Sequence, residues 1–200
     1  MKAPPFAYAR ARSLSEAFQL LETYGDSAKL LAGGQSLLAA LNLRLSSPRI
    51  LIDIARIPEL SGIRVARDKI RIGALTTHAE IERSAEIAAS LPLLAQAAPH
   101  VAHVAIRNVG TFGGSVVMAD PAAEWPACCV ALDASFVISS RTGSRRAQAR
   151  EFFKGTYATD LRQNEILTEI EFPASDSGHR SAFLELVRRR GDYAIVGVAA

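Results

Sequence analysis

The first sixty residues alternate between apolar residues at helical spacing and short, continuous apolar runs. Ser13 and Glu16 form the S-x-x-E pattern that precedes many helices, and apolar residues then recur at helical spacing over 17–24. Gly25 follows and supplies a stop signal, because glycine readily adopts the backbone conformation that ends a helix. This part of the chain is therefore predicted to begin with a capped amphipathic helix.

Two short apolar runs, at 28–32 and 50–54, are typical of buried strands. Between them we expect a second helix with one apolar face, capped by Ser36 and ended by Pro48. A strand, a helix and a strand with such short connections predict a small βαβ unit with a right-handed crossover.

From residue 63 onward, apolar and polar residues alternate as they do in half-exposed strands. The expected strands are 63–65, 70–72, 136–140, 145–149, 166–172 and 183–187, of which the first four form two hairpins. The expected helices are 77–84, which opens with a capping box of Thr77 and Glu80, then 91–104, whose extent Pro92 and Pro99 limit, and 123–132.

Together these patterns predict an α+β protein with two lobes. Residues 1–60 are expected to form the βαβ lobe and 61–176 the antiparallel lobe, with the boundary at Asp176-Ser177-Gly178. The chain then ends in an apolar run, 195–200, without a turn or cap, and domains rarely end in an unpaired apolar strand. We therefore expect 177–200 to be the start of a further, incomplete domain, and the chain to be a fragment.

Composition narrows the class of protein. Apolar residues make up 49% and charged residues 22%, as in an ordinary globular protein. A net charge of +3 and 6% aromatic residues argue against a nucleic-acid binder. No apolar run is long enough to span a membrane, no secretory signal is visible and no C-x-x-C motif suggests a metal site. Because the adjacent Cys128 and Cys129 are poorly placed to pair, a reduced, cytoplasmic protein is expected.

A first glycine-rich segment separates a predicted strand from a predicted helix. It consists of Ala32, Gly33, Gly34, Gln35, Ser36 and Leu37. Two glycines let a backbone approach a ligand closely, and the start of a helix presents free N–H groups, so the segment is a candidate phosphate site. Taken alone, a tight turn with a serine cap is the more common reason for such a segment.

A second segment of the same kind lies within RNVGTFGGS at 107–115. It consists of Thr111, Phe112, Gly113, Gly114 and Ser115. Two such segments, far apart in the chain, suit one ligand with two phosphates, because a pyrophosphate needs donors from two sides. With both segments considered, a dinucleotide-binding site and two purely structural turns explain the pattern equally well.

These segments, with ADPAAEWPA at 119–127 and RRRGDYAIVGVAA at 188–200, resemble the FAD-binding medium subunit of molybdenum hydroxylases, the family of carbon monoxide dehydrogenase and xanthine dehydrogenase. The resemblance covers essentially the whole chain, and the motifs occur in the family's order. It implies the FAD-binding fold of the vanillyl-alcohol-oxidase/PCMH type, followed by a smaller C-terminal domain.

The resemblance also implies roles for individual residues. The backbones of both glycine-rich segments would bind the FAD pyrophosphate, and Glu124 would hydrogen-bond ribityl or ribose hydroxyls. Ile166 or Leu167 would lie near the flavin, and Tyr193 would pack near the isoalloxazine ring. From its position beside Gly-Asp, Arg190 could hold a phosphate or a partner carboxylate, although a solvated strand end explains it equally well. No catalytic acid or base and no metal ligand is assigned.

Partner subunits are implied in the same way. A large subunit would carry the molybdopterin cofactor and a small subunit two [2Fe–2S] clusters. The resemblance implies that the three subunits assemble as a dimer of heterotrimers. Electrons would pass from the clusters to FAD and then to an external acceptor. Three alternatives remain open: a stand-alone flavin oxidase, a dinucleotide-binding module without redox turnover, and a structural protein whose glycine-rich segments are only turns.

A few other residues have a structural and a functional interpretation. His78 is expected to pack at the start of a helix rather than to transfer protons, and the two cysteines to belong to the core. The arginines of the second predicted hairpin are expected to form an exposed face; they are Arg141, Arg145, Arg146 and Arg150.

Overall fold

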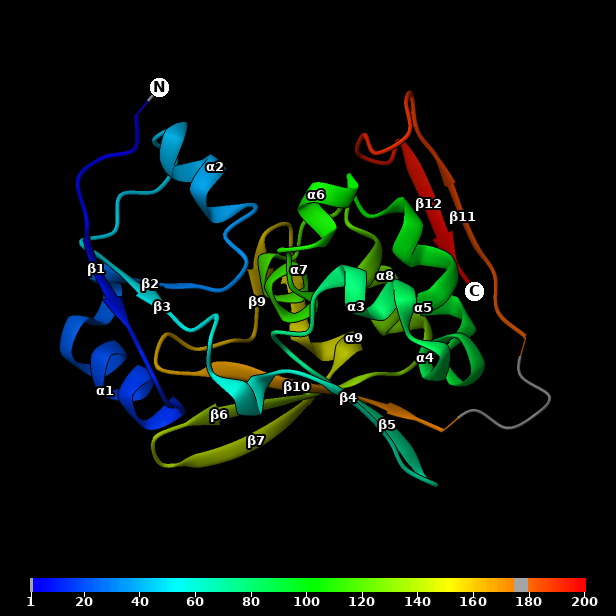
Figure 1. The fold of residues 1–200 in the computed structure, drawn as a ribbon, viewed down its shortest axis with the longest axis horizontal. Helices are drawn as coiled ribbons and strands as arrows, with labels where there is room; N and C mark the ends of the chain where they lie inside the picture. Colours follow the sequence, from blue (N-terminus) through cyan, green and yellow to red (C-terminus); the bar gives the residue numbers. More distant parts are fainter. Residues whose placement is uncertain (1, 175–179) are drawn as a thin grey trace.

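The computed structural model describes residues 2–174 and 180–200, so the expected domain boundary at 176–178 lies outside the described residues. The first lobe contains the predicted parallel unit (Figure 1). Its strands are β1 (Ala7–Arg10), β2 (Ala28–Leu31) and β3 (Ile50–Asp53), hydrogen-bonded in the parallel order β1-β3-β2. All four residues of the central strand are buried, because a parallel strand is covered on both faces.

The first helix, α1 (Leu14–Tyr24), begins and ends where its sequence signals predict. The Ser13 hydroxyl accepts the Glu16 N–H at 3.2 Å, and Gly25 ends the helix at a φ of +50°. Ala17, Phe18 and Leu21 on its inner face pack into the core of the first lobe.

The second helix, α2 (Leu37–Asn42), differs from its prediction at both ends. The Ser36 side chain makes no cap, because Ser36 itself has helical backbone angles and its hydroxyl does not reach back to the next turn. The helix ends at Asn42, well before Pro48, and Arg44 follows in the left-handed region at a φ of +58°.

The second lobe is an antiparallel five-stranded sheet in the order β4-β5-β10-β6-β7. Its strands are β4 (Ile63–Val65), β5 (Lys69–Gly73), β6 (Ser135–Ser140), β7 (Gly143–Gln148) and β10 (Ile166–Pro173). Both predicted hairpins are confirmed, and β10 joins them by pairing with β5 and β6. The shorter pairs are β8 (Phe153–Gly155) with β9 (Ala158–Thr159), and β11 (Phe183–Leu186) with β12 (Val196–Ala199).

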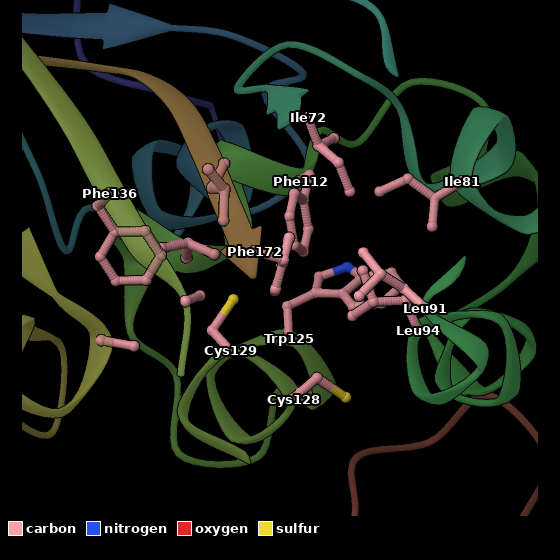
Figure 2. Close-up of a cluster of buried hydrophobic side chains, with 14 of the residues drawn as sticks. Ile72, Ile81, Leu91, Leu94, Phe112, Trp125, Cys128, Cys129, Phe136 and Phe172 are labelled. Atoms are coloured by element: carbon pink, nitrogen blue, oxygen red, sulfur yellow. The ribbon is translucent and has the colours of Figure 1, made fainter. Parts of the chain in front are cut away.

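Helices cover one face of this sheet (Figure 1). They are α3 (His78–Arg83), α4 (Ala85–Ser90), α5 (Pro92–Ala97), α6 (Val104–Arg107), α7 (Phe112–Met118), α8 (Glu124–Ala131) and α9 (Ala149–Phe152). Short 3₁₀ turns lie at η1 (Gly25–Ser27), η2 (Pro58–Leu60) and η3 (Ala98–His100). In the core beneath them, Phe112 meets Trp125 edge to face at 5.1 Å and stacks on Phe172 at 6.2 Å (Figure 2).

Three expectations for the second lobe need correction. The stretch 91–104 is divided, because Pro92 begins α5, Pro99 lies in η3, and the backbone leaves the helical region before α6. Gly113 and Gly114 belong to α7 rather than to a turn. The terminal apolar run is not unpaired, because β12 forms an antiparallel pair with β11.

The structure also places the two cysteines and the arginines of the β6–β7 hairpin. Cys128 and Cys129 are buried and unbridged, and their sulfur atoms point in different directions (Figure 2). Arg145 departs from the expected exposed face, because its side chain is only 27% exposed and pairs with Asp160 and Glu165. Within residues 2–174 and 180–200, no helix is long and apolar enough to cross a membrane.

Candidate cofactor site

The first glycine-rich segment lies against the backbone immediately before the second. An added Cβ on Gly33 would lie 2.3 Å from the Val109 carbonyl oxygen and 2.8 Å from the Gly110 Cα, so no side chain fits there. Gly34, the next residue, has a φ of +70°, which glycine adopts without strain. The fold therefore brings together two segments that are far apart in the sequence.

The first segment has N–H groups without protein partners. Among the described residues, no protein oxygen accepts a hydrogen bond from the backbone N–H groups of 33–37. The Gln35 side-chain amide instead donates to the Gly33 carbonyl at 3.0 Å, within the segment. A run of unpaired N–H groups attracts an anion. These amides, rather than the dipole of the six-residue α2, make the segment a candidate phosphate site.

The second segment uses its N–H groups inside the protein. The bonds are Phe112 N–H to Thr76 O at 2.9 Å, Gly113 N–H to Ala74 O at 2.8 Å, Gly114 N–H to the Thr111 hydroxyl at 3.2 Å, and Ser115 N–H to Thr111 O at 3.1 Å. These bonds fix the start of α7 against the loop that follows β5. An added Cβ on Gly113 would lie 2.5 Å from the Ala74 Cβ, so this glycine permits close packing. The exposed Gly114 and the half-buried Ser115 remain at the surface.

Glu124 begins α8 beside a cavity of about 50 Å³. Residues of α8 and of the β11–β12 hairpin line this cavity, among them Glu185 and Ala194. Burial raises the pKa of Glu124 to about 7, and the nearby carboxylates of Glu185 and Asp120 also raise it. Glu124 is therefore close to half-ionised at neutral pH.

Tyr193 and Arg190 lie in the loop between β11 and β12. Tyr193 is 75% exposed, and Arg190 is also exposed and forms no ion pair with another described residue. Gly191, which has a φ of +85°, packs this loop on the segment before α6: an added Cβ would lie 2.4 Å from the His103 ring. Both side chains are thus exposed, on a loop that packs against the segment before α6.

Ile166 and Leu167 occupy the junction of the two lobes rather than an exposed surface. Ile166 is 1% exposed and belongs to the core of the first lobe, whereas Leu167 is 4% exposed and belongs to the core of the second. The structure brings neither side chain to the surface that carries Tyr193.

Sequence reasoning missed the partner of His78. Its Nδ1 accepts the indole N–H of Trp125 at 3.0 Å, so the imidazole proton is assigned to Nε2. Burial lowers the pKa of His78 to about 4, and Arg107 adds to this effect, so the ring is neutral near pH 7. An added Cβ on Gly110 would lie 2.8 Å from Nε2, so the ring supports the backbone just before the second segment. Trp125 lies 47 residues away, and no sequence signal links the two.

Arg107 is a second support that the sequence pattern did not reveal. Its buried guanidinium pairs with both carboxylate oxygens of Glu82, at 2.8 and 3.2 Å, and donates to the carbonyls of Val101 and Ala102 at 3.1 Å. A bidentate, fully hydrogen-bonded arginine holds a loop rigidly. Here it fixes the turn against which the Tyr193 loop packs.

The fold and the contacting glycine-rich segments define a two-lobed, PCMH-type FAD-binding protein. Residues 4–175 match the family described as the FAD binding domain in molybdopterin dehydrogenase. The chain belongs to this family of FAD-binding subunits of molybdenum-containing dehydrogenases, as the sequence motifs predict.

Relatives cover nearly the whole chain. It is 44% identical to subunit alpha of the 6-hydroxypseudooxynicotine dehydrogenase complex of Paenarthrobacter nicotinovorans, over 100% of this chain and 68% of the relative. It is 44% identical to the carbon monoxide dehydrogenase medium chain of Hydrogenophaga pseudoflava, over 98% and 68%. It is 41% identical to the glyceraldehyde dehydrogenase medium chain of Sulfolobus acidocaldarius, over 100% and 70%.

Solved structures agree with the sequence relatives. A chain of carbon monoxide dehydrogenase from Hydrogenophaga pseudoflava superimposes with a TM-score of 0.97 at 44% identity, over 100% of this chain and 69% of that chain. A chain of quinoline 2-oxidoreductase from Pseudomonas putida 86 gives a TM-score of 0.95 at 40% identity, over 100% and 69%. The antiparallel lobe and the final hairpin are therefore part of the shared fold.

Proposed function

We propose that the first glycine-rich segment binds the pyrophosphate of FAD through the free N–H groups of 33–37. The single observation that supports this most directly is the run of unpaired amides, which Gly33 holds against the backbone of 109–110, just before the second segment. In the second segment the amides of 112–115 are already engaged, so the side-chain hydroxyls of Ser115 and Thr111 are the groups left to donate to a phosphate.

The other predicted residues suit the remaining parts of FAD. Glu124 accepts hydrogen bonds from ribityl or ribose hydroxyls, and Tyr193 offers an exposed aromatic face to the isoalloxazine ring. Arg190 is free to pair with an anion on the same side. Ile166 and Leu167 contribute only if the ring reaches the junction of the two lobes where both are buried.

We further propose that this chain serves electron transfer in a larger complex. When bound, FAD supplies the redox chemistry, and the residues described above bind it, orient it and exclude water. Electrons arrive from a [2Fe–2S] subunit and leave to an external acceptor, while a large subunit carries the molybdopterin cofactor. Relatives named as a medium chain or as a subunit of a dehydrogenase complex support this role. We also propose that two such heterotrimers form a dimer and that the complex is cytoplasmic.

Reconstitution with FAD tests the binding step. We expect the purified chain to retain flavin absorption bands after FAD addition and desalting, and Gly34→Val to lose them because its side chain would crowd Leu31 and Leu38 at a positive φ. Gly143→Val is the matched control, since Gly143 also has a positive φ but faces open space in the β6–β7 turn.

Equal flavin retention in both variants would refute the phosphate site. A second measurement then tests the role in electron transfer: reduced [2Fe–2S] subunit should bleach the flavin of the assembled complex. Flavin that stays oxidised in a complex with reduced clusters would refute the electron-transfer role while leaving FAD binding intact.

A further inference from the structure

The β11–β12 hairpin has an unusual distribution of side chains. Phe183 and Glu185 lie on the inner face of β11, whereas Leu184 and Leu186 point to the exposed face. A strand that packs on helices normally buries its apolar residues, so an inward glutamate beside two outward leucines requires an explanation.

The Glu185 carboxylate is enclosed and has no hydrogen-bond partner. Its side chain is 1% exposed, and neither carboxylate oxygen accepts a hydrogen bond from the described residues. Among the described residues, the basic side chain within 4 Å is that of His100 on η3, but its Nδ1 lies 3.8 Å from a carboxylate oxygen, too far for a hydrogen bond. A buried carboxylate without donors is costly when ionised, so protonation or a ligand must relieve it.

The Glu185 side chain lines the cavity between α8 and the β11–β12 hairpin. Glu185 and Glu124 both line it, together with backbone and small or apolar side chains. A volume of about 50 Å³ is large enough to hold water, since one water needs about 10–15 Å³. Two carboxyl groups therefore line one small cavity.

Few charged groups act on Glu124 and Glu185. Asp120, before α8, adds a third negative charge near Glu124, and His100 is the basic group near Glu185. Burial raises the pKa of both glutamates, and their mutual repulsion raises that of Glu124 further. Cys128 on α8 stays protonated, because burial and Glu124 raise its pKa to about 12.

We propose that Glu185 and Glu124 form an electrostatically coupled carboxyl pair across this cavity, and that Glu185 is a positioning residue that controls the ionisation of Glu124. The pair itself rests on the geometry of the cavity, whereas its effect on the cofactor rests on the proposed FAD-binding function. Because FAD hydroxyls donate to ionised Glu124, protonation of the pair weakens FAD binding. The hairpin thus makes cofactor affinity depend on pH near neutrality.

The pair can be observed without the cofactor. In the whole chain carrying side-chain ¹³C-labelled glutamate, NMR between about pH 5 and 9 should show one glutamate titrating near 7, and Glu124→Gln should remove that signal. Glu185→Gln should lower the midpoint by about one pH unit, because it removes the neighbouring charge. Glu59→Gln, at an exposed position, is the matched control, and His100→Gln separates the titration of the imidazole from that of the pair.

FAD titrations on the same proteins test the consequence. In the wild type, the FAD dissociation constant should rise by up to about tenfold per pH unit below the midpoint, and Glu185→Gln should move this rise to lower pH. An unchanged NMR midpoint in a folded Glu185→Gln variant would overturn the pair. A shifted midpoint with FAD affinity independent of pH would overturn the role of Glu185 in cofactor binding, while FAD binding itself would stand.

Discussion

The two glycine-rich segments look alike in sequence but differ in what their backbones do. The first leaves the N–H groups of 33–37 without partners, whereas in the second those of 112–115 donate to Thr76, Ala74 and Thr111. Gly33 needs to be glycine because another backbone lies against it, and Gly113 because Ala74 does. The first segment therefore has unpaired N–H groups, whereas the second uses its own to anchor the start of α7.

We expect the largest effect on FAD binding from Gly33→Val. The new side chain would collide with the Val109 carbonyl and push the two segments apart, so we expect FAD affinity to fall by at least about a hundredfold. Isothermal titration with FAD measures the loss, and circular dichroism checks that the fold remains. Wild-type affinity in a folded variant would show that contact between the segments is not needed.

A smaller effect is expected from Gly113→Ala, which tests the anchoring role. The added methyl would lie 2.5 Å from the Ala74 Cβ, and such overpacking typically costs about 1–3 kcal/mol of unfolding free energy. Urea denaturation of the apoprotein measures it. If stability were unchanged while FAD affinity fell, the second segment would be a ligand-binding segment rather than an anchor.

The smallest effect concerns the two serines expected to cap helices. Ser13→Ala should cost about 1 kcal/mol, because its hydroxyl accepts the Glu16 N–H. Ser36→Ala should change unfolding free energy by less than about 0.5 kcal/mol, because Ser36 makes no cap. Equal losses in the two apoproteins, measured by urea denaturation, would mean that Ser36 caps α2 in solution.

Local signals predicted much of the fold. The caps at Ser13 and Thr77, the stop at Gly25 and the two alternating hairpins depend on neighbours within a few residues, and all are present. The sequence predicts only in part how 91–104 is divided. A proline can end a helix that precedes it, but it can also begin a new helix, as Pro92 begins α5. In β11, with the sequence FLEL, either Phe183 and Glu185 or Leu184 and Leu186 could face inward. The burial of Glu185 therefore cannot be predicted from the strand's own pattern.

The site was predicted less completely than the fold. Motif order points to both glycine-rich segments, Glu124 and Tyr193 as candidates. It does not show which amides are free, since Thr76 and Ala74 lie more than thirty residues before their bonding partners. The supports at His78 and Arg107 likewise depend on Trp125 and Glu82, which are distant in sequence. Partners of this kind follow from the three-dimensional fold rather than from a local pattern.

Amide hydrogen exchange, read residue by residue with and without FAD, tests the central claim most directly. The account predicts fast exchange at 33–37 in the apoprotein and clear protection once FAD binds, while 112–115 are protected in both states. Amides at 33–37 that stay unprotected in the FAD-bound protein would contradict the account.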